Sequence, residues 1–176
     1  MASLEIKGMT EFEVKLARLG DMADAAARAA VYKAAGIVAD AVRQRLEGLE
    51  EELPVHAGDR YRYVPPGGSF RAIPSQEKRD LLAGLGVTPI SPDEDENWNA
   101  KVGFEARTEN QKGYDGQPTK KYPKGRPLLM IARSVESGTS MRPKQPFFRP
   151  AVDESKKKAV EAMNQAIVAA QEKIMK

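Results

Sequence analysis

Residues 132–152 read ARSVESGTSMRPKQPFFRPAV, and this stretch decides how the last two helices of the chain are connected. Gly138 follows a helix-forming run, and glycine in a left-handed conformation is a common way to end a helix. Pro143, Pro146 and Pro150 keep the next segment extended, because proline fixes φ and disfavours helix in the residue before it. The pattern predicts that one helix ends at Gly138 and that another begins near Pro150.

Two further features of this stretch concern charge and packing. Glu136 lies in the last turn of the first helix, where a negative charge is unfavourable unless it is paired, and Arg133 or Arg142 is the expected partner. Phe147 and Phe148 are adjacent in an extended segment, so their rings point to opposite sides. One ring enters the core easily. The other needs a second surface, either on another subunit or in a second packed layer of this one.

Upstream, the strongest periodic signal runs from Met22 to about Leu49, where apolar residues recur every three or four positions. It predicts a long amphipathic helix. A shorter helix is expected before it, starting at Thr10 and ending at Gly20 with Asp21. The first half of the long helix is rich in alanine, which permits close approach of another helix within the chain or from another subunit. A short edge strand is expected to precede both helices, at residues 4–6.

The middle of the chain predicts mixed structure. Residues 53–74 are rich in proline and glycine, which indicates a projecting hairpin or loop. Ser75 is the expected N-cap of a short helix through Leu85. Alternating apolar residues at 98–104 indicate strands, and a buried helix is expected from Pro127 to Gly138.

Together these elements predict an α+β fold in a single domain over residues 1–176. A small antiparallel sheet is expected to pack against the long central helix, the buried helix and the C-terminal helix. With 41% hydrophobic and 30% charged residues, the composition is that of an ordinary folded domain. The sequence shows no apolar run near the ~20 residues that a bilayer requires and no secretory signal at its start, so we expect cytosolic synthesis and no membrane association.

Charge is unevenly distributed along the chain. Residues 101–176 hold 16 Lys and Arg against 8 Asp and Glu, whereas residues 1–100 hold 12 against 17. This asymmetry is either an ordinary property of solvated surfaces or the sign of a subunit whose acidic part meets the basic part of a neighbour.

Catalytic and metal-binding patterns are weak. The chain has no cysteine and one histidine, His56, and no nucleophile-elbow, P-loop or dinucleotide-binding motif is present. Asp93, Asp95 and Asn97 have the spacing of a calcium loop, but Trp98 and Phe104 occupy the positions that require glycine and glutamate, which favours an acidic surface turn. The sequence therefore predicts no catalytic residues, no metal and no cofactor.

Basic runs leave a second function class open. RYRY at 60–63, KKYPKGR at 120–126 and KKK at 156–158 offer cations for phosphates and tyrosines for base stacking. The chain as a whole is only mildly basic and contains no recognised nucleic-acid module. The alternative hypothesis is a non-specific nucleic-acid-binding module.

The sequences VESGTS and KQPFFRPAV resemble the phage head-tail joining or tail-completion family, the gene-product-ten-like tail components of long-tailed phages. Members carry an E-x-G-T turn and a QPF-x-x-PA entry into a terminal helix. RDLLAGL at 79–85 is similar to the short central helix of the family, whereas residues 53–74 depart from shorter relatives. The matching positions in the last third of the chain are Glu136, Gly138, Thr139, Gln145, Pro146, Phe147, Pro150 and Ala151.

The resemblance implies a structural protein of a bacteriophage or prophage virion, without enzymatic activity. It would complete the tail or join head to tail, as a neck component that forms a homo-oligomeric, hexameric ring between the connector and the tail. The implied partners are the tail terminator or tail tube protein and the connector proteins below the portal, and a contact with DNA in the lumen stays open. The candidate structural joint and subunit interface comprises Arg133, Glu136, Gly138, Thr139, Gln145, Pro146, Phe147, Phe148 and Pro150.

Overall fold

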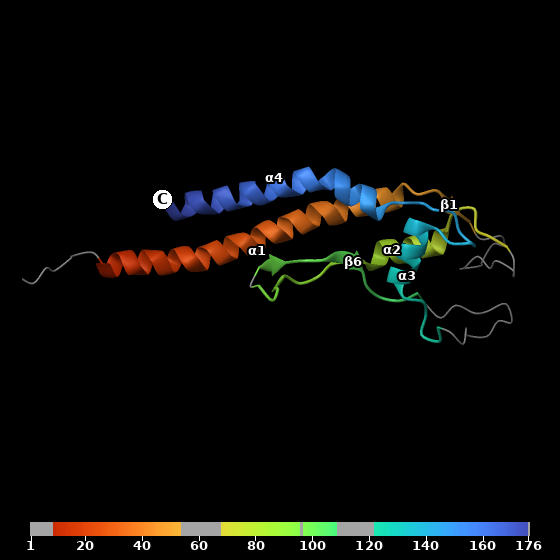
Figure 1. Ribbon diagram of the computed structural model, residues 1–176, viewed down its shortest axis with the longest axis horizontal. Helices are drawn as coiled ribbons and strands as arrows, with labels where there is room; N and C mark the ends of the chain where they lie inside the picture. The colour runs from red at the N-terminus through yellow and green to blue at the C-terminus, as the bar shows by residue number, and fades with distance from the viewer. Residues whose placement is uncertain (1–8, 54–67, 96, 109–121, 176) are drawn as a thin grey trace, which may run out of the picture.

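The computed structural model describes residues 9–53, 68–95, 97–108 and 122–175 and has an elongated shape (Figure 1). Two long helices, α1 (Met9–Glu47) and α4 (Phe148–Met175), lie side by side and antiparallel along its longest axis. The shorter helices α2 (Ser75–Gly84) and α3 (Leu128–Ser137) lie where α1 ends and α4 begins. We call residues 42–53, 68–87, 102–108 and 122–155 the compact end, and residues 20–38 with 156–175 the helical arm.

Short strands pair in three places. β1 (Glu51–Glu52) runs parallel to β2 (Ile73–Pro74), β3 (Leu85–Val87) is antiparallel to β6 (Val102–Phe104), and β4 (Ser91–Pro92) is antiparallel to β5 (Trp98–Asn99). Between β3–β6 and β4–β5, the Thr88 amide donates to the Lys101 carbonyl at 2.8 Å, so the two antiparallel pairs form one hairpin. The predicted α+β class, with antiparallel strands against helices, is confirmed. The strands are divided into two-stranded pairs, and one pair is parallel.

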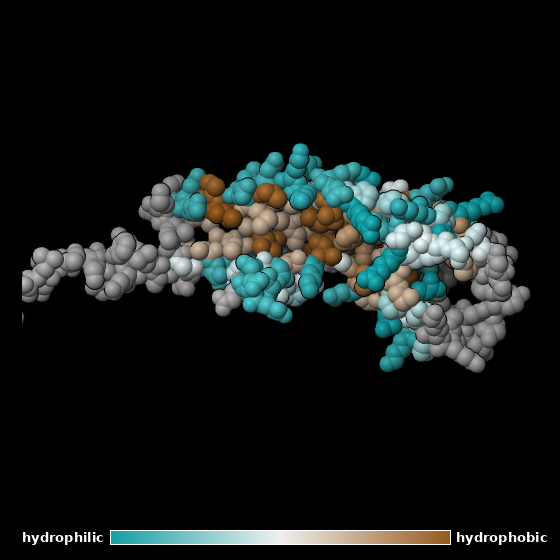
Figure 2. All heavy atoms as spheres, viewed as in Figure 1, coloured by the Kyte–Doolittle hydropathy of each residue, from teal (hydrophilic) through white to brown (hydrophobic). Residues whose placement is uncertain are grey.

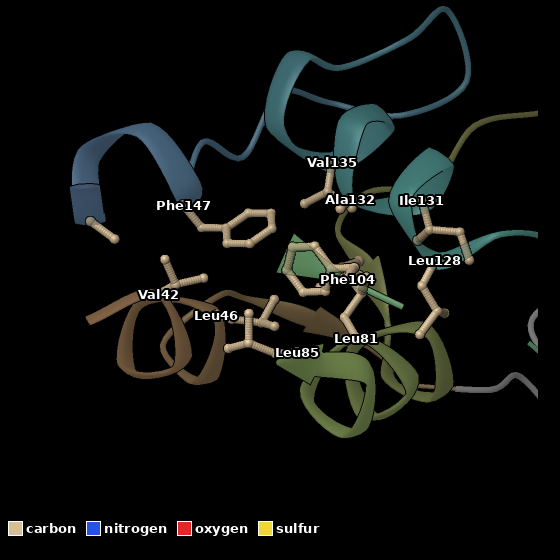
Figure 3. Packing of buried hydrophobic residues seen from close by; sticks show 12 residues of the cluster. Val42, Leu46, Leu81, Leu85, Phe104, Leu128, Ile131, Ala132, Val135 and Phe147 are labelled. Carbon is tan, nitrogen blue, oxygen red and sulfur yellow. The ribbon is translucent and has the colours of Figure 1, made fainter. Parts of the chain in front are cut away.

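The core lies inside the compact end, and each helix contributes the side chains of one of its faces to it (Figure 3). Its large fully buried side chains come from α1, α2, α3, β2 and the residue just before α4. Each helix has an apolar stripe that only its neighbours can cover. Full burial of one such side chain contributes about 1.5–3 kcal/mol. The largest are Phe147, Leu46, Ile73, Leu81, Leu128, Ile131, Val42 and Val135.

The N-terminal helices differ from the sequence prediction. One helix, α1, runs through Gly20 and Asp21, so the predicted end at these residues is wrong. A glycine inside a helix costs only about 1 kcal/mol, which the strong helix formers on both sides offset. The predicted start at Thr10 lies one residue after the observed start at Met9. The strand expected at residues 4–6 lies outside the described residues, as do the side chains of 9–19.

Other helix ends lie close to their predicted positions. Pro74, not Ser75, is the N-cap of α2, and no side chain caps it. The helix ends at Gly84 because Leu85 already belongs to β3, where it lies opposite Phe104. α4 begins at Phe148, two residues before Pro150, and a proline is tolerated in the first helical turn because its missing N–H has no partner to lose there.

Gly84 shows why the RDLLAGL segment has a glycine just before its last residue. A Cβ at this position would lie 2.2 Å from the Cδ1 atom of Leu128 and 2.6 Å from the carbonyl oxygen of Glu105. The Glu105 amide also donates to the Gly84 carbonyl at 3.0 Å. The end of α2 therefore packs directly against α3 and the residue after β6, which only glycine permits.

The alanine surface of α1 has one clear use within the chain. Ala30, Ala34 and Ala35 are buried, and on α4 Ala159 and Ala162 are buried as well. Small side chains on both helices allow their close packing along the helical arm. Ala23, Ala25 and Ala29 are exposed, so part of the alanine surface faces solvent.

The segment predicted to be a projecting hairpin or loop, 53–74, is described only at its ends. Residues 54–67 lie outside the described part of the chain, together with His56 and the RYRY run. The described ends are held side by side, since β1 precedes the segment and β2 closes it.

Candidate functional site

The joint, defined as residues 133–150, connects α3 to α4 and contains the residues that carry the family resemblance. Gly138 ends α3 with φ +72° and ψ 169°, a combination that is essentially restricted to glycine. A Cβ here would also lie 3.0 Å from the amide nitrogen of Lys144. The prediction that Gly138 ends this helix is confirmed. Its φ is positive as expected, but its ψ of 169° is extended and not that of the predicted left-handed turn.

A tight turn follows Gly138. Thr139 and Arg142 exchange backbone hydrogen bonds of 2.9 and 3.2 Å, and the Thr139 hydroxyl accepts from the Met141 amide at 3.3 Å. Gln145 then returns to α3, with its amide donating to the Val135 carbonyl at 2.9 Å. Its side-chain amide donates to the Glu50 carbonyl at 3.2 Å. The joint is therefore fastened to α3 and to the residues that follow α1.

Glu136 joins the two helices that the joint separates. Its carboxylate accepts hydrogen bonds from the backbone amides of Phe147 and Phe148, both at 2.8 Å, and of Arg149 at 3.2 Å. These amides start α4 and have no partner inside the helix, so a carboxylate satisfies them and also meets the positive end of the helix dipole. The predicted pairing of Glu136 with Arg133 or Arg142 is wrong, because its oxygens cap α4.

Arg142 instead forms a buried ion pair with Glu77 of α2. Both side chains are 4% exposed. Arg126, which is partly exposed, reaches the same carboxylate at 3.4 Å, and the ring of Phe70 lies 5.1 Å from the Arg142 guanidinium. A buried charge is stable only where it is paired, so this contact ties the joint firmly to α2.

Sequence reasoning missed the Glu77–Arg142 pair. Glu77 lies in the first turn of α2, where an acidic residue is ordinary because it suits the helix dipole. Arg142 stands in a loop before a proline. The two residues are 65 positions apart, and no periodicity connects them.

The two phenylalanines of the joint both pack within the chain. Phe147 is fully buried, and its ring meets Phe104 at 5.9 Å between centroids in an edge-to-face arrangement. Phe148 is half-buried and lies 6.2 Å from the same Phe104 ring. Figure 3 shows Phe147 and Phe104 facing each other between the helices. The expectation that one ring enters the core easily is confirmed, and the second ring packs at the edge of the same cluster.

The partly exposed edge of Phe148 faces an apolar groove of about 250 Å³. Its floor comes from β6, α3 and the start of α4, and its charged lining includes Arg133 and Arg149, both exposed. Val102 and Phe148 also line a second hollow, between α1 and the start of α4. Figure 2 shows hydrophobic surface over the two long helices on the face in view. The apolar floor comprises Val102, Phe104, Leu129, Ala132, Phe147 and Phe148, and we call this feature the Phe148 groove.

The remaining candidate residues take simple positions. Arg133 is exposed on α3, Pro146 is exposed before α4, and Pro150 lies half-buried in the first turn of that helix. The turn at 93–97 is local, since the Asp93 carboxylate accepts from the amides of Asp95 at 3.0 Å and Asn97 at 2.8 Å. Within the described residues, no group of three or more His, Cys, Asp or Glu side chains is arranged to hold a metal.

The uneven charge of the chain is partly balanced inside it. Glu77, from the acidic half, pairs with Arg142 and Arg126 of the basic half. The exposed pair of Arg45 with Glu154 has the opposite sense and does not reduce the asymmetry. The lysines at 156–158 are exposed on α4. The RYRY run and the first two lysines of KKYPKGR lie outside the described residues.

Comparison with known proteins returned no relatives: no family model, no curated protein and no solved structure matches this chain. Among the described helices, none combines the length and the apolar character needed to cross a membrane. The fold and the joint define an elongated α+β protein in which a buried ion pair and a cross-helix cap fix the start of the last helix.

Proposed function

We propose that this chain is a structural virion protein of a bacteriophage or prophage, a neck component that completes the tail or joins head to tail. In this proposal, copies of the chain assemble into a hexameric ring. The ring lies between the connector below the portal and the tail terminator or tail tube.

The observation that carries the proposal is the construction of the joint. Glu136, Gly138, Thr139, Gln145 and Phe147, which carry the family resemblance, each make a specific structural contact, and together they fix the start of α4. None of these contacts presents a nucleophile, an acid or a base to solvent. Residues that serve packing and helix capping are suited to a subunit with a structural role.

The shape of the subunit gives further support. Large apolar side chains on the two long helices are exposed, among them Tyr32 on α1 and Val160 and Val168 on α4. Exposed apolar surface on a folded chain often marks a contact with another protein. An elongated subunit with such a surface is suited to a ring, where each copy meets two neighbours.

Native mass spectrometry and light scattering test the proposal, first on the purified chain at rising concentration and then with candidate tail terminator and connector proteins added. We expect one closed oligomer, of six copies, that binds at least one of these partners. A chain that stays monomeric in every mixture would contradict the ring. Steeply salt-dependent gel shifts of duplex DNA by that monomer would favour the nucleic-acid-binding alternative.

A further inference from the structure

We infer that the Phe148 groove is the acceptor for Leu53 of a second copy of this chain, with the acidic residues before Leu53 lying against the arginines of the groove. This inference deepens the proposed ring, on which it rests, by naming the two surfaces that meet. In the proposed ring the contact is head-to-tail, with Leu53 of each copy in the groove of the next copy. A closed dimer, in which two copies exchange Leu53 reciprocally and the double-cysteine variant stops at the covalent dimer, would contradict it.

The groove has the size of a side-chain acceptor. Its volume of about 250 Å³ is below the ~300–1,000 Å³ of typical small-molecule sites. Its floor is made of rings and aliphatic side chains, and Leu129 at its margin is 46% exposed. An apolar side chain inserted here would cover Leu129 and the exposed edge of Phe148.

The margin of the groove carries positive charge. Arg133 projects from α3 and Arg149 from the first turn of α4, and both side chains are exposed. Glu136 also lines the groove, but its carboxylate is occupied by the amides of α4. The groove therefore favours an apolar side chain that is accompanied by acidic residues.

Leu53 is such a side chain. It is 68% exposed, the highest value among the exposed large hydrophobic residues that the structure describes. Glu50 and Glu51, both exposed, precede it closely. Because Leu53 is exposed in its own subunit, it does not occupy the groove of that subunit.

The segment that carries Leu53 is held in place before any contact is made. β1 pairs with β2, the Glu52 carboxylate accepts from the Arg71 amide at 3.1 Å, and the Lys78 ammonium donates to the Leu49 carbonyl at 2.8 Å. A segment that is already ordered loses little conformational entropy on binding. We call residues 50–53 the acidic edge.

Disulfide trapping tests the contact directly, because the chain has no cysteine of its own. The full-length double variant Leu53→Cys with Leu129→Cys is oxidised mildly and run on a non-reducing gel. We expect a ladder of covalent oligomers, because every copy carries both surfaces. Mixing the two single variants should give covalent dimers and nothing larger. A matched control, Leu53→Cys with Val168→Cys, should give no ladder.

Charge variants test the same contact without crosslinking. Arg133→Glu with Arg149→Glu should weaken self-association at least tenfold, and so should Leu53→Asp; a tenfold change corresponds to about 1.4 kcal/mol. Mixing these two kinds of variant should give a dimer, since one intact pair of surfaces remains. Lys156→Glu with Lys157→Glu makes the same charge change on α4 and should leave assembly unchanged. Because these positions are exposed, urea unfolding of the dissociated chain should match the wild type. Leu53→Ala supplies a milder second variant.

The outcomes separate the contact from the proposed function. A closed ring in native mass spectrometry without any ladder, or with unaltered assembly of the charge variants, would overturn the contact and leave the ring standing. A ladder without a ring of fixed size would support the contact and contradict closure. Charge variants that still form the ring but lose a tail protein would overturn a second copy as the occupant. A monomer in all mixtures, without a ladder, would overturn both.

Discussion

The compact end and the helical arm use the same two long helices in different ways. At the compact end they contribute large side chains to one buried cluster, with Val42 and Leu46 on α1 and Phe147 just before α4. Along the arm their buried residues are small, among them Ala30 on α1 and Ala159 on α4. We infer that buried contacts set the position of α4 where this helix starts, and that the path of the arm follows from that position.

Polar contacts follow the same division. The compact end contains a buried ion pair and a carboxylate that caps a helix across the joint. The arm has exposed contacts, such as Arg28 with Asp24 at 3.2 Å on α1. Buried polar groups are costly to leave without partners, whereas exposed ion pairs contribute little. Substitutions at the compact end should therefore destabilise the chain more than substitutions in the arm.

The largest effect is expected for Phe147→Ala. Removing a fully buried ring leaves a cavity and should lower the free energy of unfolding by about 4 kcal/mol. Phe148→Ala should cost about 1–2 kcal/mol, because half of that ring is already near solvent. Urea unfolding of the dissociated chain measures both. Equal losses for the two variants would show that Phe148 is as much a core residue as Phe147 and would weaken its role at a subunit contact.

The second effect concerns the buried ion pair. Glu77→Gln should cost about 3 kcal/mol, because it leaves the Arg142 guanidinium buried without a counter-charge. Arg142→Met should cost less, about 2 kcal/mol, because Arg126 still reaches Glu77. The double variant Glu77→Gln with Arg142→Met should recover part of the loss in urea unfolding, because no buried charge is then left without a partner. Simple additivity of the two single losses would show that the pair is not coupled.

The third effect is on the cap of α4. Glu136→Ala removes an acceptor from three backbone amides and should destabilise the chain by about 2 kcal/mol. Glu136→Gln keeps an acceptor oxygen without the charge and should cost about 1 kcal/mol. In Glu136→Ala, the amides of 147–149 should exchange faster with solvent than they do in the wild type. The amides in the middle of α4 should change less. Unchanged protection at 147–149 would mean that the cap does not hold the start of the helix.

The smallest effect is expected where the hairpin of residues 88–101 meets the arm. Trp98 of β5 donates from Nε1 to Asp24 of α1 at 2.7 Å, and the Arg28 guanidinium lies 4.0 Å from its ring centroid. Trp98→Phe keeps an aromatic ring but removes the donor, and should cost about 1 kcal/mol. Hydrogen exchange should increase in the 88–101 hairpin and leave the compact end unaffected. A global loss as large as that of Glu136→Ala would contradict the division into two regions.

Some features of this fold can be predicted from the sequence at particular residues. Gly138 was predicted to end α3 because few residues other than glycine adopt its positive φ. The apolar stripe on α1 and the buried helix before Gly138 were also predicted. Helical periodicity can be recognised in the sequence because it relates residues that are only one turn apart. The continuation of α1 through Gly20 was not predicted. Glycine has a low helix propensity, but stable helical turns on both sides of it override that preference.

The candidate site was predicted in its location but not in its contacts. The prolines before α4 indicated where the joint lies. The sequence suggested nearby arginines as partners of Glu136, whereas its partners are the backbone amides at the start of α4. Its true partners lie 11–13 positions away, and those of Glu77 lie 49 and 65 positions away. Such pairings depend on how the helices pack, which no short sequence window contains.

By itself, the sequence determined the class of fold, the end of α3 at Gly138 and the joint as the segment that carries specific chemistry. These follow from backbone sterics and from apolar periodicity, which act over a few residues. The tertiary structure decided which groups Glu136 and Arg142 bind, that both phenylalanines pack on Phe104, and that a groove with two arginines is left beside Phe148. These features depend on packing between helices far apart in the chain, because the cost of burying a charge or a ring is set by what surrounds it.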